Sequence, residues 1–140
     1  MIKSFRGLLE PDTVTTIRLS TNDGLTGYKV NKFRAISYDP RSISNEAVLK
    51  LYTVPQATTG DKINFDDPTL LGVNFFVSNQ ANTYHAQEVI IFDNTKFNQD
   101  IYITCESTDG NMNFYLELEQ VKLAKDEAAV ATLKDMRGRE

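Results

Sequence analysis

The sequence predicts an all-β protein, an antiparallel, jelly-roll-like β-sandwich of seven to eight strands with a short C-terminal helix. Most of the chain consists of short β-rich segments of alternating apolar and polar residues, separated by turn residues, as in sandwiches and small barrels. No helical period lies between these segments, and eight antiparallel strands in two sheets is the jelly-roll number. An immunoglobulin-like sandwich is the alternative. The chain has no Trp and one Cys, so it lacks that fold's usual buried tryptophan and paired cysteines.

In the first half of the chain, alternation and turn residues define four strands. Thr15, Ile17 and Leu19 share one face of the segment TVTTIRLS. The apolar phase slips within YKVNKFRAISY, which indicates a β-bulge. Pro55 ends the following strand, because proline cannot donate to a β-ladder. We expect these strands at residues 3–9, 13–20, 28–38 and 47–54.

In the second half, four more strands are expected, at residues 70–77, 88–92, 100–106 and 112–123. The first of them places alternate apolar residues on one face: Leu71, Val73, Phe75 and Val77. The last has an inner face of Met112, Phe114, Leu116 and Leu118. Its apolar phase changes after Gln120, which suggests a second bulge. Two long loops, at 56–69 and 78–87, remain as places where function could lie.

The last residues differ in character, so we divide the chain into a sandwich domain at 1–124 and a helical tail at 125–140. Asp126 is the expected N-cap, alanines follow it, and Gly138 can end the helix. A helix this short is marginal alone and must dock, either on its own sandwich or on a partner. The candidate partner-contact residues form its apolar stripe and its basic end: Val130, Leu133, Met136 and Arg137.

Charge is unevenly distributed along the 140 residues, whose net charge is -4. Residues 1–50 carry eight basic and five acidic residues, whereas 51–121 carry two basic and ten acidic ones. A nucleic-acid partner is not expected, because such proteins usually concentrate basic charge on one face. The asymmetry suits either head-to-tail contacts between copies or an ordinary solvated surface. No membrane span and no secretory signal are expected, and the single cysteine suits a reducing compartment.

No catalytic, cofactor-binding or metal site is expected. Cys105 follows Ile101 and Ile103 in alternation, which indicates a buried side chain and not a nucleophile. His85, the only histidine, is expected in an exposed loop without ligands for zinc. The Asp and Asn residues of NFDDP and FDNTKFNQD lack the calcium-loop pattern and are expected to shape turns: Asp66, Asp67, Asp93, Asn94, Asn98 and Asp100. Tyr28 and Tyr84, near loops, could serve an interface or a sugar platform.

Four stretches resemble a group of small proteins encoded by marine tailed bacteriophages: SFRGLL, TNDGLTGYKVNKF, IIFDNTKFNQDIYIT and YLELEQVKLAKDEAAVATLKDMR. The similarity runs along nearly the whole chain and carries no catalytic residue. It implies a non-enzymatic virion structural protein, assembled in the host cytoplasm. The nearest architectural analogy is with capsid decoration (cement) proteins, which bind the outer capsid surface and stabilise contacts between capsid subunits.

The resemblance also implies partners. These are the major capsid protein or another virion protein, with self-association as a homo-oligomer in which a trimer is favoured. Two alternatives stay open. One is a structural protein of the tail, neck or fibre, which would occur at low copy number. The other is a carbohydrate-binding or receptor-binding β-sandwich, which the absence of Trp disfavours.

Overall fold

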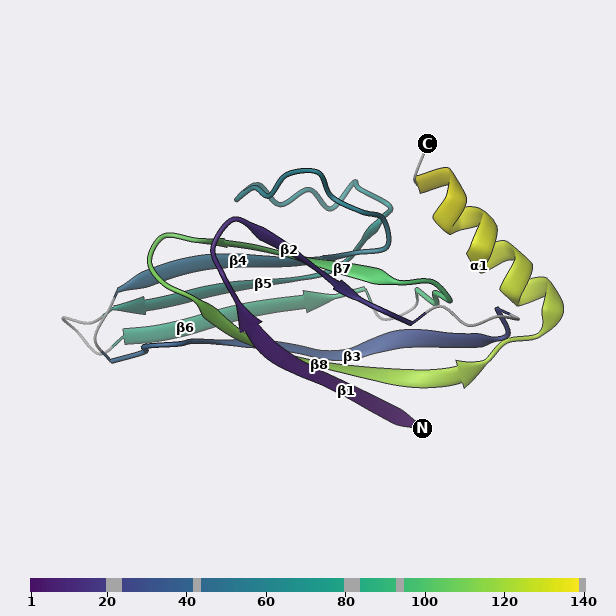
Figure 1. Cartoon of the computed structure of the whole chain (residues 1–140), viewed down its shortest axis with the longest axis horizontal. Helices are drawn as coiled ribbons and strands as arrows, with labels where there is room; N and C mark the ends of the chain where they lie inside the picture. The colour runs from purple at the N-terminus through teal and green to yellow at the C-terminus, as the bar shows by residue number, and fades with distance from the viewer. Residues whose placement is uncertain (20–23, 42–43, 80–83, 93–94, 139–140) are drawn as a thin grey trace.

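The computed structural model of the chain describes residues 1–19, 24–41, 44–79, 84–92 and 95–138, without the side chains of residues 79, 84, 85 and 134–138. Within these residues, eight strands precede one helix (Figure 1). In order they are β1 (Ile2–Leu9), β2 (Thr13–Ile17), β3 (Thr26–Ser37), β4 (Asn45–Tyr52), β5 (Leu70–Asn79), β6 (Tyr84–Ile91), β7 (Ile101–Ser107), β8 (Met112–Lys122) and α1 (Lys125–Gly138). The predicted all-β class with a C-terminal helix is confirmed.

The strands form two antiparallel sheets, with strand orders β1-β8-β3 and β2-β7-β4-β5-β6. A jelly roll can be described as a long antiparallel ribbon in which β1 pairs with β8, β2 with β7, β3 with β6 and β4 with β5. Three of these four pairs are present here. Strand β6 instead continues the larger sheet beside β5. The fold is thus a jelly-roll-like sandwich with strands divided three and five.

Side chains bridge the place where β3 and β6 are not paired. The Ala35 amide of β3 donates to Gln87 Oε1 of β6 at 3.1 Å. The Phe33 carbonyl accepts a hydrogen bond from Asn74 Nδ2 of β5 at 3.1 Å. Because buried backbone groups need partners, Asn74 and Gln87 replace part of the missing strand pairing.

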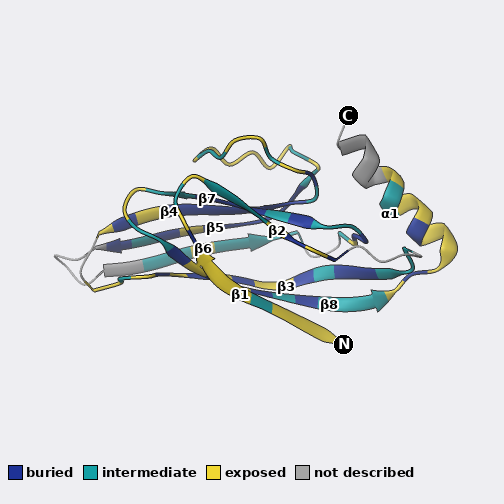
Figure 2. Ribbon diagram, viewed as in Figure 1, coloured by how far each residue is buried: buried dark blue, intermediate teal, exposed yellow. Residues whose placement is uncertain are grey.

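The core lies between the sheets, and Figure 2 shows buried segments concentrated on the strands. Leu116 lies at its centre, level with Phe5 of β1 and Phe33 of β3 on either side. Leu116 and Phe33 are fully buried, and Phe5 packs against them from the edge. The expected inner face of β8 is confirmed, since its four predicted residues belong to this core.

One of the two expected bulges is present. The register of β3 against β8 shifts between Val30 and Lys32, where the apolar phase changes in the sequence. The second expected bulge, after Gln120, is wrong, because pairing with β3 continues without a shift to Lys122. Leu123 is buried because it lies beyond the strand, where the Leu25 carbonyl accepts a hydrogen bond from its amide.

The apolar face expected on β5 does not form one continuous surface. Val73 and Phe75 face outward, and Asn74 and Phe76 occupy the inner positions. Leu71 nevertheless reaches the core, because the register between β4 and β5 shifts beside it. Alternation showed which residues share a face, but it could not show that the outer face would also be covered.

The segment 53–69 provides that cover, since it lies over the outer side of the five-stranded sheet (Figure 1). Its residues shield the outward side chains of Val48, Lys50 and Tyr52, all of which are buried. The expectation of a second long loop at 78–87 is wrong. Strands β5 and β6 extend into it, so that only residues 80–83, which lie outside the described residues, separate them.

Gly27 allows close packing where the sandwich leads into α1. A Cβ atom at this position would lie 2.8–2.9 Å from three side-chain atoms of Leu123. We expect Gly27→Ala to lower the free energy of unfolding by about 1–2 kcal/mol, because well-packed sites tolerate extra atoms poorly. Urea unfolding measures the change. Gly60→Ala is the matched control, since a Cβ atom added there would have no neighbour within 4 Å, and equal losses in both variants would contradict the packing argument.

Candidate functional site

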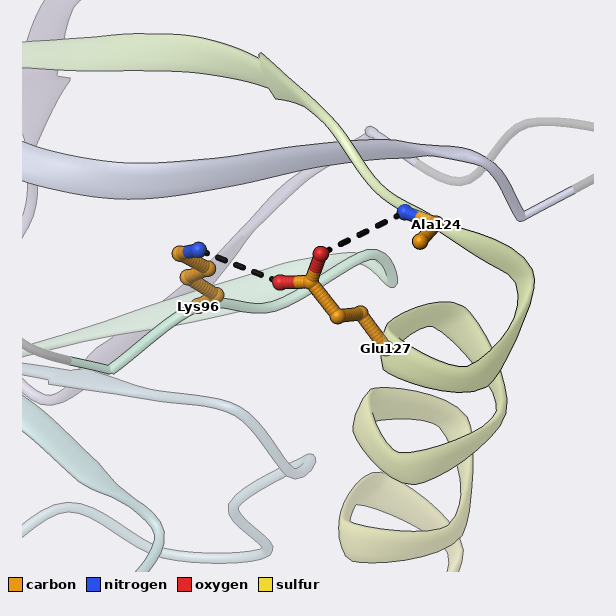
Figure 3. A network of polar contacts seen from close by, with 3 residues as sticks. All are labelled: Lys96, Ala124 and Glu127. Carbon is orange, nitrogen blue, oxygen red and sulfur yellow. Dashed lines mark hydrogen bonds and ion pairs between the residues drawn. The ribbon is translucent and has the colours of Figure 1, made fainter.

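The helix α1 begins immediately after the sandwich and is fastened at its first turn. Glu127 accepts a hydrogen bond from the Ala124 amide at 3.4 Å and forms an ion pair with Lys96 at 3.2 Å (Figure 3). The Ala128 amide donates to the Ala124 carbonyl at 2.9 Å, so Ala124 occupies the cap position. The expectation that Asp126 is the N-cap is therefore wrong. Asp126 lies in the first turn, where its charge favours the helix dipole.

Asn98 fixes the side of α1 that faces the sandwich. This buried side chain projects from the segment between β6 and β7. Its Nδ2 atom lies 2.9 Å from Thr132 Oγ1, 3.0 Å from the Gly24 carbonyl oxygen and 3.4 Å from the Ala128 carbonyl oxygen. Ala128 is itself buried. The helix thus packs on its own sandwich, which was one of the two expected alternatives.

The segment that carries Asn98 is in turn tied to β3. Phe97 and Tyr28 exchange both backbone hydrogen bonds, at 2.8 and 3.0 Å, and their rings stack with centroids 6.2 Å apart. Tyr28 is buried in this contact, so the expectation that it could serve an interface or a sugar platform is wrong. The side chain of Tyr84 lies outside the described residues. The expected role of Asn98 as a turn residue is also wrong, because it clamps the helix.

Docking through Ala128 and Thr132 leaves two of the predicted contact residues at the surface. Val130 is 52% exposed and Leu133 is 51% exposed. Each lines a different groove beside the helix. The groove at Val130 has a volume of about 350 Å³ and is bordered by Lys96 and Leu123. The groove at Leu133 has a volume of about 660 Å³ and is bordered by Leu25.

These two exposed apolar side chains remain candidate contact residues, and their role in a contact stays a prediction. The side chains of Met136 and Arg137, also predicted, lie outside the described residues. The sequence did not identify Asn98 as the residue that decides which helix face stays free. Its only available signal was an asparagine four residues after Asn94 in a turn-forming segment, which does not distinguish a clamp from a turn.

A second cluster, around Lys50, was not predicted. Lys50 Nζ donates to the Lys62 carbonyl at 2.7 Å and lies 5.8 Å from the centre of the Tyr52 ring. Burial lowers the pKa of Lys50, and the carboxylates of Asp61, Glu106 and Asp67 oppose that effect. Lys50 therefore fastens the covering segment 53–69 to the sheet, through its hydrogen bond to the Lys62 carbonyl and the charges of the surrounding acids.

The other residues considered as candidates for a chemical site have structural roles. Burial raises the pKa of the Cys105 thiol to about 12, and the Glu106 and Asp12 charges add to the rise, so the thiol stays protonated at neutral pH. Asp67 accepts hydrogen bonds from the Thr69 amide at 2.9 Å and hydroxyl at 2.6 Å, which confirms its expected turn role. Asp100 accepts a hydrogen bond from the Leu19 amide at 2.7 Å.

The expected loop position of His85 is wrong, because this residue belongs to β6, although its side chain is not described. Asp93 and Asn94 lie outside the described residues. Among the residues that the structure describes, no group of three His, Cys, Asp or Glu side chains is arranged to hold a metal ion. Within the same part of the chain, no helix has the length and apolar character needed to cross a membrane.

Comparison with protein families, with curated proteins and with solved structures finds no match to this chain.

Proposed function

We propose that this chain is a non-enzymatic virion structural protein of the capsid decoration type. In this role it binds the outer capsid surface and stabilises contacts between capsid subunits. The observation that carries the proposal is the helix α1, which is held to the sandwich by Asn98 while Val130 and Leu133 remain exposed. A contact made by these side chains would need no ordering of the first helix turns, because Glu127 and Ala128 already hold them in place.

Two further points support the proposal. Four sequence stretches resemble small proteins of tailed bacteriophages. The all-β sandwich is also similar in kind to capsid decoration proteins, although architecture alone does not determine function. The capsid partner should present an apolar ridge or side chain to each groove, because both grooves border an exposed aliphatic side chain.

Copy number in purified particles tests the proposal directly. Quantitative gel densitometry against the major capsid protein should give hundreds of copies per particle. Six or twelve copies would contradict capsid decoration and favour a tail or neck position. Absence from purified particles would contradict the virion role altogether.

A variant tests the contact itself. We expect Val130→Ser/Leu133→Ser to melt at the same temperature as the wild type, because both side chains are already exposed. The variant should lose binding to particles that lack the protein, measured by co-sedimentation. Ile2→Ser is the matched control, since Ile2 is 51% exposed on β1 and lines neither groove. Equal binding by the double variant and the wild type would remove the helix from the interface.

A further inference from the structure

The outer face of the three-stranded sheet is open to solvent and carries a basic and apolar surface. Strand register places Arg6, Tyr115 and Arg34 in one row across β1, β8 and β3. The next row holds Leu8, Asn113 and Ile36. All six point away from the core, because their neighbours along each strand point into it. We call these two rows the basic face.

The basic face exposes three large apolar or aromatic side chains to solvent. Leu8 is 48% exposed, Ile36 is 57% exposed and Tyr115 is 38% exposed. Arg6 and Arg34 lie on either side of Tyr115 in the strand register, and both arginines are exposed. In the next row toward the end of β8, the Glu117 carboxylate accepts a hydrogen bond from the Tyr115 hydroxyl at 3.1 Å and lies opposite Lys32, and the row beyond holds the ion pair between Lys29 and Glu119, at 3.2 Å. The four basic residues of this sheet surface, Arg6, Lys29, Lys32 and Arg34, therefore outnumber the two acids. Adjacent exposed aromatic, aliphatic and arginine side chains are typical of contact surfaces.

The opposite side of the sandwich carries the complementary surface. Asp12, Asp61 and Glu106 lie together there, at the β1–β2 turn, on segment 53–69 and on β7. Ile63 is 40% exposed and Phe65 is 56% exposed on the same covering segment. We call these five residues the acidic face. Figure 1 shows segment 53–69 above the five-stranded sheet, with the three-stranded sheet below it.

The acidic face keeps a net negative charge, because its three carboxylates outnumber the two ammonium groups beside them, those of Lys50 and Lys62. The carboxyl group of Asp12 lies close enough to Glu106 to raise the pKa of Glu106, and the Asp61 charge adds to the rise. Lys62 pairs with Asp61 at 3.7 Å, but its side chain is 96% exposed and extends into solvent. Crowded carboxylates of this kind are stabilised by an incoming guanidinium, which can bond two carboxylate oxygens at once.

We propose that a second copy of this chain covers the basic face, through a head-to-tail contact in which it packs against the acidic face of the next copy. Arginines then meet carboxylates, while Leu8 and Ile36 meet Ile63 and Phe65. The contact is heterologous, because it uses different surfaces on the two copies, and the pair retains one free basic face and one free acidic face. This inference does not depend on the proposed virion function.

Two variants, each altering one face, test the contact by analytical ultracentrifugation. Arg6→Ser/Arg34→Ser removes charge from the basic face, and Asp61→Asn/Glu106→Gln removes it from the acidic face. After Glu106→Gln the side-chain oxygen can still accept the 2.6 Å hydrogen bond from Thr59, and Lys50 keeps its Lys62 carbonyl acceptor and the Asp67 charge, so the covering segment should stay in place. Thermal melting by circular dichroism checks that both variants are folded. Arg18→Ser/Lys122→Ser is the control for the basic-face variant, because it removes the same two positive charges from exposed positions outside the two faces.

We expect the wild type and the control to exceed the 15.8 kDa chain mass increasingly as concentration rises. Raising the salt from about 0.05 to about 0.5 M should weaken their association about tenfold, because the paired charges are screened. Each face variant alone should remain at the mass of one chain. An equimolar mixture of the two variants should reach twice 15.8 kDa and no more, because only one intact pair of faces remains in each complex.

Three results would overturn the proposal. A wild type that stays at the mass of one chain at every concentration would exclude self-association. An acidic-face variant that associates like the wild type would indicate a symmetric contact through other residues. A mixture of the two variants that stays monomeric would show that the two faces do not meet.

Discussion

The free energy of unfolding is expected to fall by about 4 kcal/mol between pH 9 and about 12 because of one residue, Cys105. An unfolded thiol ionises near pH 9.0, whereas the folded protein keeps this thiol protonated until about 12. The side chain is fully buried, so its thiolate would lose hydration. The folded pKa is raised. The stabilisation is therefore complete below pH 9 and is lost as the pH rises toward 12.

The expected loss is large, because a domain of this size is stable by only about 5–15 kcal/mol. The slope between the two pKa values approaches about 1.4 kcal/mol per pH unit, the value for one proton. Urea unfolding of the wild type and of Cys105→Ala at several pH values measures it. The variant loses a small core contact at every pH, so the difference between the two curves isolates the thiol.

Other groups titrate in the same range and must cancel in that difference. Burial raises the pKa of Tyr52, which adds to the alkaline loss, whereas burial lowers the pKa of Lys50, which acts in the opposite sense. Both are present in wild type and variant. Parallel stability curves for the two proteins between pH 9 and 12 would contradict a buried, neutral Cys105.

The strands were predictable because alternation records directly which residues share a face. Cys105, Ile103 and Ile101 alternate in the sequence and are all fully buried in the structure. The bulge near Val30 was predictable for the same reason, since an inserted residue shifts the apolar phase. At Gln120 the same signal misled, because a strand that ends and a strand that bulges both change the phase.

What covers a sheet could not be predicted from the strands alone. Lys50 lies between Val48 and Tyr52 on the outward face of β4, where a lysine normally meets solvent. It is buried because segment 53–69 folds over it and the Lys62 carbonyl accepts a hydrogen bond from its ammonium group. That contact depends on where an irregular segment lies in space, and irregular segments have no periodic signal.

The helix illustrates the same limit at the candidate site. Its existence and its apolar residues followed from the sequence, but the choice between Ala128 and Val130 as the buried residue did not. Asn98, about 30 residues away, makes that choice by bonding the Ala128 carbonyl and the Thr132 hydroxyl. A polar clamp of this kind is specific to one pairing of segments, so no local pattern indicates it.

We therefore expect Asn98→Ala to release α1 while the sandwich stays folded. The substitution removes the donor to two acceptors of α1, the Thr132 hydroxyl oxygen at 2.9 Å and the Ala128 carbonyl oxygen at 3.4 Å, at about 1 kcal/mol for each hydrogen bond. The free energy of local opening should fall by about 2 kcal/mol, because a helix of this length has little stability of its own. Hydrogen exchange should show about 30-fold less protection at the α1 amides. Amides of β4 and β8 should keep their protection.

Lys96→Ala is the matched control for that measurement. It breaks another side-chain contact between the same segment and the helix, the ion pair with Glu127, whose partners are 50% and 46% exposed. An exposed ion pair contributes about 0–1 kcal/mol, so α1 should keep most of its protection. Similar losses in both variants would show that Asn98 has no special role. A loss confined to Asn98→Ala would identify one buried amide as the residue that presents Val130 and Leu133 to a partner.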